Sequence, residues 1–78
     1  MEHDTETRLR KLVADVLDVD IEQIGEPLGP GAAEAWDSMA TLRVVSAVEE
    51  SFGIRFTMEE IGSLAEYASL KQLVETHL

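Results

Sequence analysis

The chain has 78 residues, of which 45% are hydrophobic and none is cysteine. Its sixteen acidic residues outnumber its six basic residues and give a formal net charge of −10, which would be repelled by nucleic-acid phosphates and by an anionic membrane surface. The lack of cysteine excludes disulfides and thiolate chemistry on the chain itself. A chain of this length buries one small core, so we expect residues 1–78 to form a single domain. We also expect the protein to be a monomer.

The first residues are acidic where a secretory signal peptide would be basic and then apolar. The chain also holds no apolar run of membrane-spanning length. We therefore expect a cytoplasmic protein whose partners are proteins with basic surfaces.

The first predicted element is a helix over residues 5–17. Its apolar side chains recur at helical spacing and form one stripe, made of Leu9, Leu12, Val13, Val16 and Leu17. Asp20 and Gln23 then have the spacing of a capping pair, which predicts one short turn. Both prolines and three glycines follow within residues 25–31 and predict a long ordered loop, with Leu28 as its anchor in the core.

Helical spacing returns from Ser38 to Phe52, and Gly53 next provides the left-handed residue that commonly ends a helix. Thr57 with Glu60 has the pattern of a capping box and predicts a brief helix. Ser69 with Gln72 has the same pattern and predicts the start of the last helix. No segment has the alternation of a β-strand. The sequence thus predicts an all-α four-helix bundle, with three main helices, one short helix and a long loop between the first two helices.

The predicted second helix carries more apolar surface than a core requires. Val44, Val45, Val48 and Phe52 fall within an arc of roughly 100°, which is enough to face the bundle. Met39 lies roughly 160° from the centre of that arc, and Leu42 roughly 100°. Two interpretations follow: these residues form a docking face, since methionine adapts to different surfaces, or Met39 folds under the preceding loop against Trp36. A docking face would have a polar rim formed by Arg43, Ser46, Glu49 and Glu50.

The start of this helix holds the dipeptide Asp37-Ser38, which by itself is a common N-cap pattern. It places a hydroxyl at the positive end of a helix, where a phosphate ester would meet free backbone N–H groups. The carboxylate of Asp37 acts against such a group, so electrostatics alone does not decide the role of Ser38.

The run Trp36-Asp37-Ser38-Met39 and the run from Val48 to Ile54 resemble the acyl carrier proteins of fatty-acid and polyketide synthesis. In that family an Asp-Ser-Leu motif opens the second helix and a Glu-Glu-x-Phe segment closes it, and the likeness extends over essentially the whole chain. The resemblance implies a carrier rather than an enzyme. A phosphopantetheinyl transferase would attach 4′-phosphopantetheine covalently to Ser38, and the thiol of that arm would hold an acyl group as a thioester.

The resemblance also implies that the second helix docks on basic surfaces of acyl-loading, chain-elongating or modifying enzymes. The positions that carry over as docking residues are Asp37, Met39, Leu42, Arg43, Ser46, Glu49 and Glu50. Ala40 and Arg43 stand where carriers of fatty-acid synthesis commonly have acidic residues, and Arg43 would place like charge against a basic partner. This difference favours a specialised carrier of a polyketide or other secondary-metabolite pathway. An aminoacyl or peptidyl carrier and an unmodified acidic helical adaptor are the alternatives.

Nothing in the sequence indicates catalysis by the chain itself. His3 and His77 lie at opposite ends, so no metal site or acid–base pair is predicted from them. No nucleophile is accompanied by a recognisable base.

Overall fold

The computed structural model describes residues 2–64 and 66–78, with side chains from Thr5 onward. These residues form helices and connecting loops, without a strand, and the all-α prediction is confirmed. The elements in chain order are α1 (Glu2–Leu17), the 3-10 turn η1 (Ile21–Gln23), α2 (Pro30–Ala35), α3 (Ser38–Phe52), α4 (Met58–Gly62) and α5 (Tyr67–His77). None of the described helices combines the length and apolar character needed to cross a membrane.

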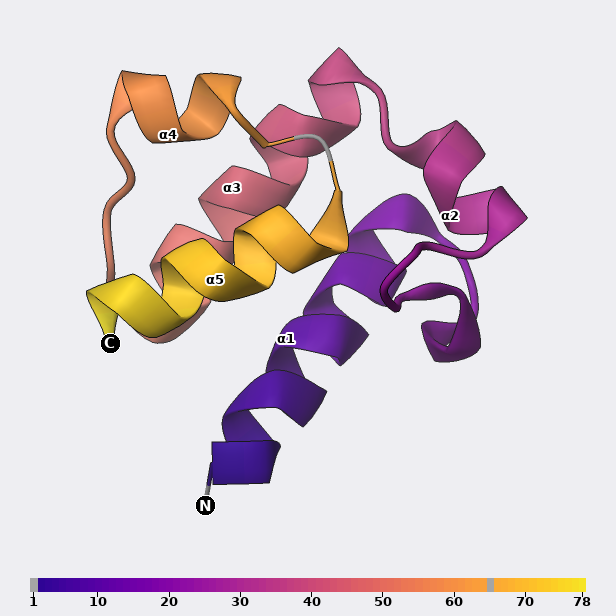
Figure 1. The fold of residues 1–78 in the computed structure, drawn as a ribbon, viewed down its shortest axis with the longest axis horizontal. Coiled ribbons are helices and arrows are strands. Elements are labelled where there is room, and N and C mark those ends of the chain that lie inside the picture. Colours follow the sequence, from indigo (N-terminus) through magenta and orange to yellow (C-terminus); the bar gives the residue numbers. More distant parts are fainter. Residues whose placement is uncertain (1, 65) are drawn as a thin grey trace.

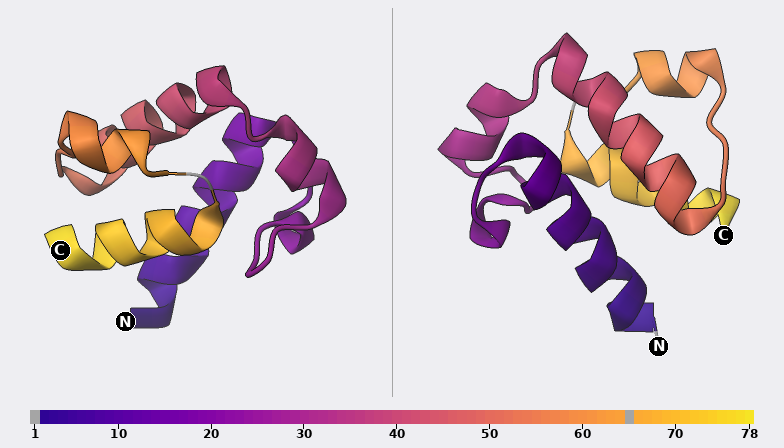
Figure 2. Two further views of the ribbon diagram at one scale, coloured as in Figure 1. Left: turned by 45° about the horizontal axis from the view of Figure 1, so that its top comes forward. Right: turned by 180° about the vertical axis from the view of Figure 1, so that it is seen from behind.

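The helices α1 and α3 form the most extensive contact of the fold. They run in opposite directions, as Figures 1 and 2 show. One Nη of Arg8 donates to the backbone oxygen of Ser51 at 3.1 Å and to its hydroxyl at 3.2 Å, which ties the first half of α1 to the end of α3. Ser38, the first residue of α3, therefore lies at the other end of the bundle from the start of α1.

The core is made of apolar side chains from α1, the first connection, α2, α3, α5 and the segments around α4. The largest fully buried side chains are Tyr67, Leu9, Ile24, Leu70, Val13, Val44, Val48 and Val74. Each large side chain removed from water in this way stabilises the fold by about 1.5–3 kcal/mol. Of the stripe predicted on α1, Leu12 and Val16 are only half-buried and pack at the edge of this core.

The core face of α3 agrees with the prediction except at its end. Val44, Val45 and Val48 are buried, whereas Phe52 is half-buried. The reason is that the ring of Phe52 lies at the surface end of the helix, with the guanidinium of Arg8 4.6 Å above its centre. The predicted end of the helix is confirmed, because Gly53 adopts the left-handed conformation with φ 67° and its N–H donates to the oxygen of Glu49.

The long first connection is not a plain loop, which corrects the sequence prediction. It contains α2, which has Pro30 at its first position. The N-terminus of this short helix is capped by the side chain of Gln23, which lies before the helix in the sequence. Oε1 of Gln23 accepts hydrogen bonds from the N–H groups of Gly31 at 2.8 Å and Ala32 at 3.4 Å. Gln23 therefore does not pair with Asp20, whose side chain makes no capping bond. A Cβ on Gly29 would displace the amide of Gln23, so a larger residue at this position would disturb the cap of α2.

The start of the last helix was also predicted wrongly. The helix α5 begins at Tyr67 with Glu66 as its N-cap, so Ser69 lies inside the helix and does not form a capping box with Gln72. Burial decides the start, because Tyr67 belongs to the stripe that α5 buries together with Leu70 and Val74. The capping box of α4 is confirmed, since the side chain of Thr57 accepts from the N–H of Glu60 and Glu60 accepts from the N–H of Thr57.

Candidate functional site

The helix α3 starts where two residues, Trp36 and Asp37, connect it to α2. Asp37 is extended and acts as N-cap: its Oδ1 accepts from the N–H of Ala40 at 2.8 Å. Its backbone oxygen accepts from both the N–H of Thr41, at 2.9 Å, and the hydroxyl of Thr41, at 3.0 Å. These bonds fix the direction of the first turn of α3. They also hold Ser38, the next residue, on the outside of that turn.

Ser38 is exposed as the first residue of α3. Its hydroxyl makes no hydrogen bond to any residue that the structure describes. The N–H groups of Ser38 and Met39 precede the first helical hydrogen bonds and are free to face a ligand, and the helix dipole favours negative charge there. The carboxylate of Asp37 accepts from the N–H of Ala40, which leaves the N–H groups of Ser38 and Met39 available to a phosphodiester on Ser38. The residues present thus fit a phosphate-linked arm on this hydroxyl.

Two large apolar side chains stand in solvent beside Ser38. Met39 is 68% exposed and Leu42 is 57% exposed. Trp36 is half-buried and packs against the core, but Met39 does not fold under the loop to join it. The structure therefore favours the first of the two interpretations of these residues, an apolar face on α3 that the bundle does not use.

The residues predicted to dock partners differ in their exposure to solvent. Six of the seven predicted docking residues are exposed: Asp37, Met39, Leu42, Arg43, Ser46 and Glu50. Glu49 is half-buried, and its Oε2 accepts from the N–H of Phe56 at 2.8 Å, so its carboxylate holds the connection between α3 and α4. Ala40 is only 6% exposed, so the sequence difference at this position lies in the core rather than on the exposed face of α3.

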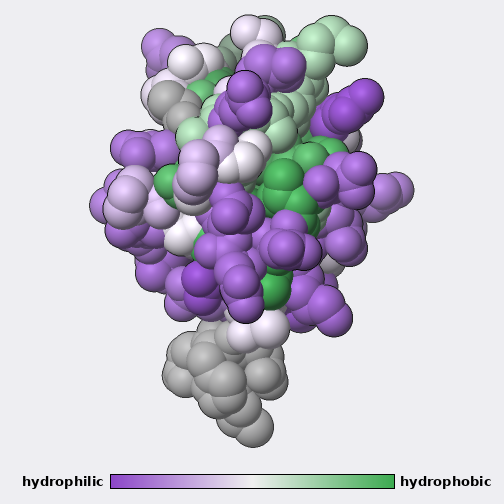
Figure 3. Space-filling model, turned by 90° about the vertical axis from the view of Figure 1, so that its right-hand side faces the viewer, coloured by the Kyte–Doolittle hydropathy of each residue, from purple (hydrophilic) through white to green (hydrophobic). Residues whose placement is uncertain are grey.

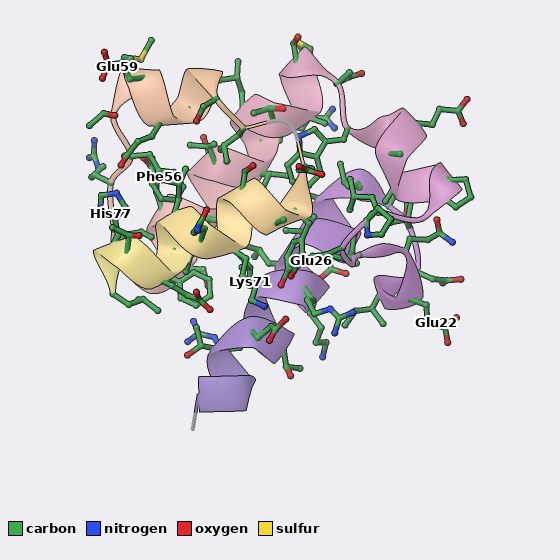
Figure 4. The ribbon with its side chains drawn as sticks, in the orientation of Figure 1. Glu22, Glu26, Phe56, Glu59, Lys71 and His77 are labelled. Carbon is green, nitrogen blue, oxygen red and sulfur yellow. The ribbon has the colours of Figure 1, made fainter. Side chains whose placement is uncertain are left out.

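Three of the basic side chains serve the fold. Besides Arg8, Arg10 donates from Nε and from one Nη to the backbone oxygen of Ile24, at 3.0 and 2.7 Å, and so fixes the first connection. Nζ of Lys71 lies 3.3 Å from carboxylate oxygens of both Glu6 and Glu26, and Figure 4 shows Lys71 and Glu26 pointing toward one another. Hydrogen bonds to these two carboxylates raise the pKa of Lys71.

A second polar contact lies at the end of the bundle away from Ser38. Nε2 of His77 is 3.1 Å from Oε1 of Glu60, and the imidazole lies beside the ring of Phe56, with centroids 5.3 Å apart (Figure 4). The backbone N–H of Thr57, together with His77, holds the pKa of Glu60 below its ordinary value. This contact joins α4 to α5. Across the described residues, no group of three or more histidine, cysteine or acidic side chains is placed to hold a metal ion.

The face shown in Figure 3 is mostly hydrophilic, with hydrophobic side chains showing between the polar ones in its middle and upper parts. Figure 4 shows Glu22 and Glu59 projecting from the bundle into solvent. The acidity of the chain is therefore carried by solvated side chains, and the structure records no buried charged residue among those it describes.

Comparison with known proteins identifies the family. Residues 7–76 match the family described as "Phosphopantetheine attachment site", and the chain belongs to that family. Its members are carrier proteins with covalently attached 4′-phosphopantetheine, and they interact with phosphopantetheinyl transferases and biosynthetic enzymes. The resemblance noted in the sequence is confirmed.

A curated relative has a more specific description. The chain is 28% identical over 71 residues to "Polyketide-8 synthase acyl carrier protein 2" of Streptomyces avermitilis, an alignment that covers 91% of the chain and 82% of the relative. No solved structure matches the chain.

Two structural roles near the site were not predicted from the sequence. Gln23 caps α2, and Glu49 binds the backbone after α3. Each of these bonds spans seven or eight residues across an irregular connection, which local sequence patterns do not predict. The one available signal was the glycine at position 29, which marks a close approach of the backbone to another group.

Proposed function

We propose that Ser38 is the attachment point of the 4′-phosphopantetheine arm and that the chain carries acyl intermediates of polyketide or related secondary-metabolite synthesis. The observation that supports this proposal is the exposed hydroxyl of Ser38, which is free of internal hydrogen bonds at the first position of α3. It lies within the part of the chain that matches the family. The named relative supports the polyketide pathway.

The chain contributes a nucleophile and a docking surface to its modification. The oxygen of Ser38 forms a bond to the phosphorus that bears pantetheine, the pyrophosphate bond of coenzyme A breaks, and adenosine 3′,5′-bisphosphate leaves. No described carboxylate or imidazole hydrogen-bonds to the Ser38 hydroxyl in the free chain, so its proton passes to a base that is positioned in the complex with the transferase. Once attached, the arm supplies the thiol that this cysteine-free chain lacks. The protein is thus a carrier without catalysis of its own, and we place it in the cytoplasm as a monomer.

Intact-mass measurement tests the carrier function. Incubation with coenzyme A, magnesium and a broad-specificity phosphopantetheinyl transferase should add the mass of one phosphopantetheine group. The Ser38→Ala variant should add none, whereas Ser63→Ala, a matched change at the exposed end of α4 and away from the docking residues, should be modified normally. A wild-type chain that gains no mass would support the unmodified adaptor instead, and aminoacylation rather than acylation of the loaded arm would support an aminoacyl carrier.

The pathway is tested separately through Arg43, which is exposed on the same face. The Arg43→Glu variant should be loaded or elongated faster than wild type by a set of fatty-acid-synthesis enzymes, because like charges at a protein interface oppose association. Equal rates for the two proteins would show that Arg43 carries no pathway information.

A further inference from the structure

Two arginines on or beside α3 have no internal partner among the described residues, a property that they share with Lys11 on α1. Arg8, Arg10 and Lys71 bind other parts of the fold. Arg43 and Arg55 are exposed, and neither forms an ion pair within residues 5–64 and 66–78. Long charged side chains retained without an internal partner, on a chain of net charge −10, are free to bind an acidic group from outside.

Arg43 lies on the outer face of α3, and Arg55 lies just beyond the end of that helix. Arg43, Ser46 and Glu50 follow one another at helical spacing on that face, on the C-terminal side of Met39 and Leu42. Arg55, in the connection between α3 and α4, encloses with Ser46, Glu49 and Glu50 a shallow hollow of ≈ 480 Å³. The right-hand view of Figure 2 shows α3 running across the back of the molecule, with this connection beside its last turns. The exposed apolar residues and the two arginines thus form one continuous strip.

The charges of the hollow restrict what can occupy it. A small anion would meet the carboxylates of Glu49 and Glu50, and a metal cation would meet the guanidinium of Arg55. The mixed lining is instead complementary to a protein surface that is also mixed, with basic groups opposite the two glutamates and an acidic group opposite Arg55.

We propose that the partner enzymes of this carrier bind α3 with a basic surface that carries carboxylates opposite Arg43 and Arg55. This inference rests on the proposed function. It specifies the charges on the surface with which partner enzymes bind the carrier. Wholly basic surfaces are disfavoured at these two positions, while the net charge of the chain still attracts partners that are basic overall. The two arginines determine which partner binds, and the apolar residues Met39 and Leu42 provide the contact area.

A charge-exchange experiment tests the proposal with a purified enzyme. A broad-specificity phosphopantetheinyl transferase is prepared with each lysine or arginine of its carrier-binding surface replaced singly by glutamate, and kcat/KM is measured on the wild-type chain at low ionic strength. At least one such variant should modify the chain about three- to fivefold faster than the parent transferase, a gain of the size expected for an exposed ion pair. The gain should shrink as salt is added.

Variants of the carrier show whether the arginines cause the gain. The gain in kcat/KM should disappear with the carrier variants Arg43→Glu or Arg55→Glu. Part of the gain should remain with Arg43→Lys, which keeps the positive charge. Lys11→Glu, which changes net charge equally on α1, should leave it intact. If no transferase variant gains, or if Lys11→Glu abolishes the gain as fully as the arginine variants do, the proposal is wrong. A chain that the parent transferase cannot modify at all contradicts the proposed function itself, so the two failures are distinguishable.

Discussion

Alanine substitutions on opposite faces of α3 should have opposite effects on stability and on modification. Val48 is fully buried, and Val48→Ala removes two methyl groups from the packed core, which should cost about 2–3 kcal/mol once the cavity is included. Met39 is 68% exposed, so only about a third of its side chain is removed from water. Its burial is worth about 0.5–1 kcal/mol, and the higher helix propensity of alanine offsets part of that. Met39→Ala should therefore cost about 0.5 kcal/mol or less.

Urea unfolding followed by circular dichroism measures the stability of both variants, and intact-mass kinetics with coenzyme A and a transferase measures their modification. Val48→Ala should be modified at the wild-type rate under conditions where it is folded. Met39→Ala should keep its stability and be modified several-fold more slowly, because Met39 lies beside Ser38 on the exposed face. Equal losses of stability would place Met39 in the core. An unchanged modification rate would show that the transferase does not use this face.

Three further substitutions test how the rest of the bundle is held. Gly53→Ala should cost about 1–2 kcal/mol in urea unfolding because φ is 67° there, and Gly53→Asn should cost less; equal costs would contradict the conformational argument. Tyr67→Phe should raise stability by about 1–3 kcal/mol, since the buried hydroxyl has no partner among the described residues. Burial raises the pKa of Tyr67 above its ordinary 10.0, so the folded protein keeps a proton that the unfolded chain releases. Stability should fall as pH rises above about 10, by up to ~1.4 kcal/mol per pH unit, and parallel losses in wild type and Tyr67→Phe would refute this assignment. Gln23→Ala should cost about 1–2 kcal/mol and speed amide exchange at Gly31, whereas the exposed Glu22→Ala should do neither.

The parts of the fold that local chemistry determines were predictable from the sequence. The bounds of α3 follow from an aspartate that caps its first turn and a glycine that ends it, and both signals act within a few residues. The apolar period likewise identified the buried valines of α3 and placed Met39 and Leu42 off that buried face, but it left open whether Met39 folds under the preceding loop. The position of Ser38 at the start of that helix needed nothing beyond these local patterns.

The parts set by contacts between distant segments were not predictable. The six residues of α2 are too few to form a stable helix alone, and the amide of Gln23 holds them in place from eight residues upstream. The start of α5 is set by the burial of Tyr67 rather than by the polar pattern at Ser69. Phe52 followed the apolar period of α3, yet its place at the helix end leaves it half-buried under Arg8.

Locating the modification within the chain tests the central claim most directly. The protein loaded by a transferase is digested, and fragmentation mass spectrometry identifies the residue that carries the phosphopantetheine group. The account predicts that the group is on Ser38 alone, with none on Thr41 or Ser46, the other hydroxyl residues in the first three turns of α3. A group found on either of those residues, or a mass gain that persists in Ser38→Ala, would contradict it.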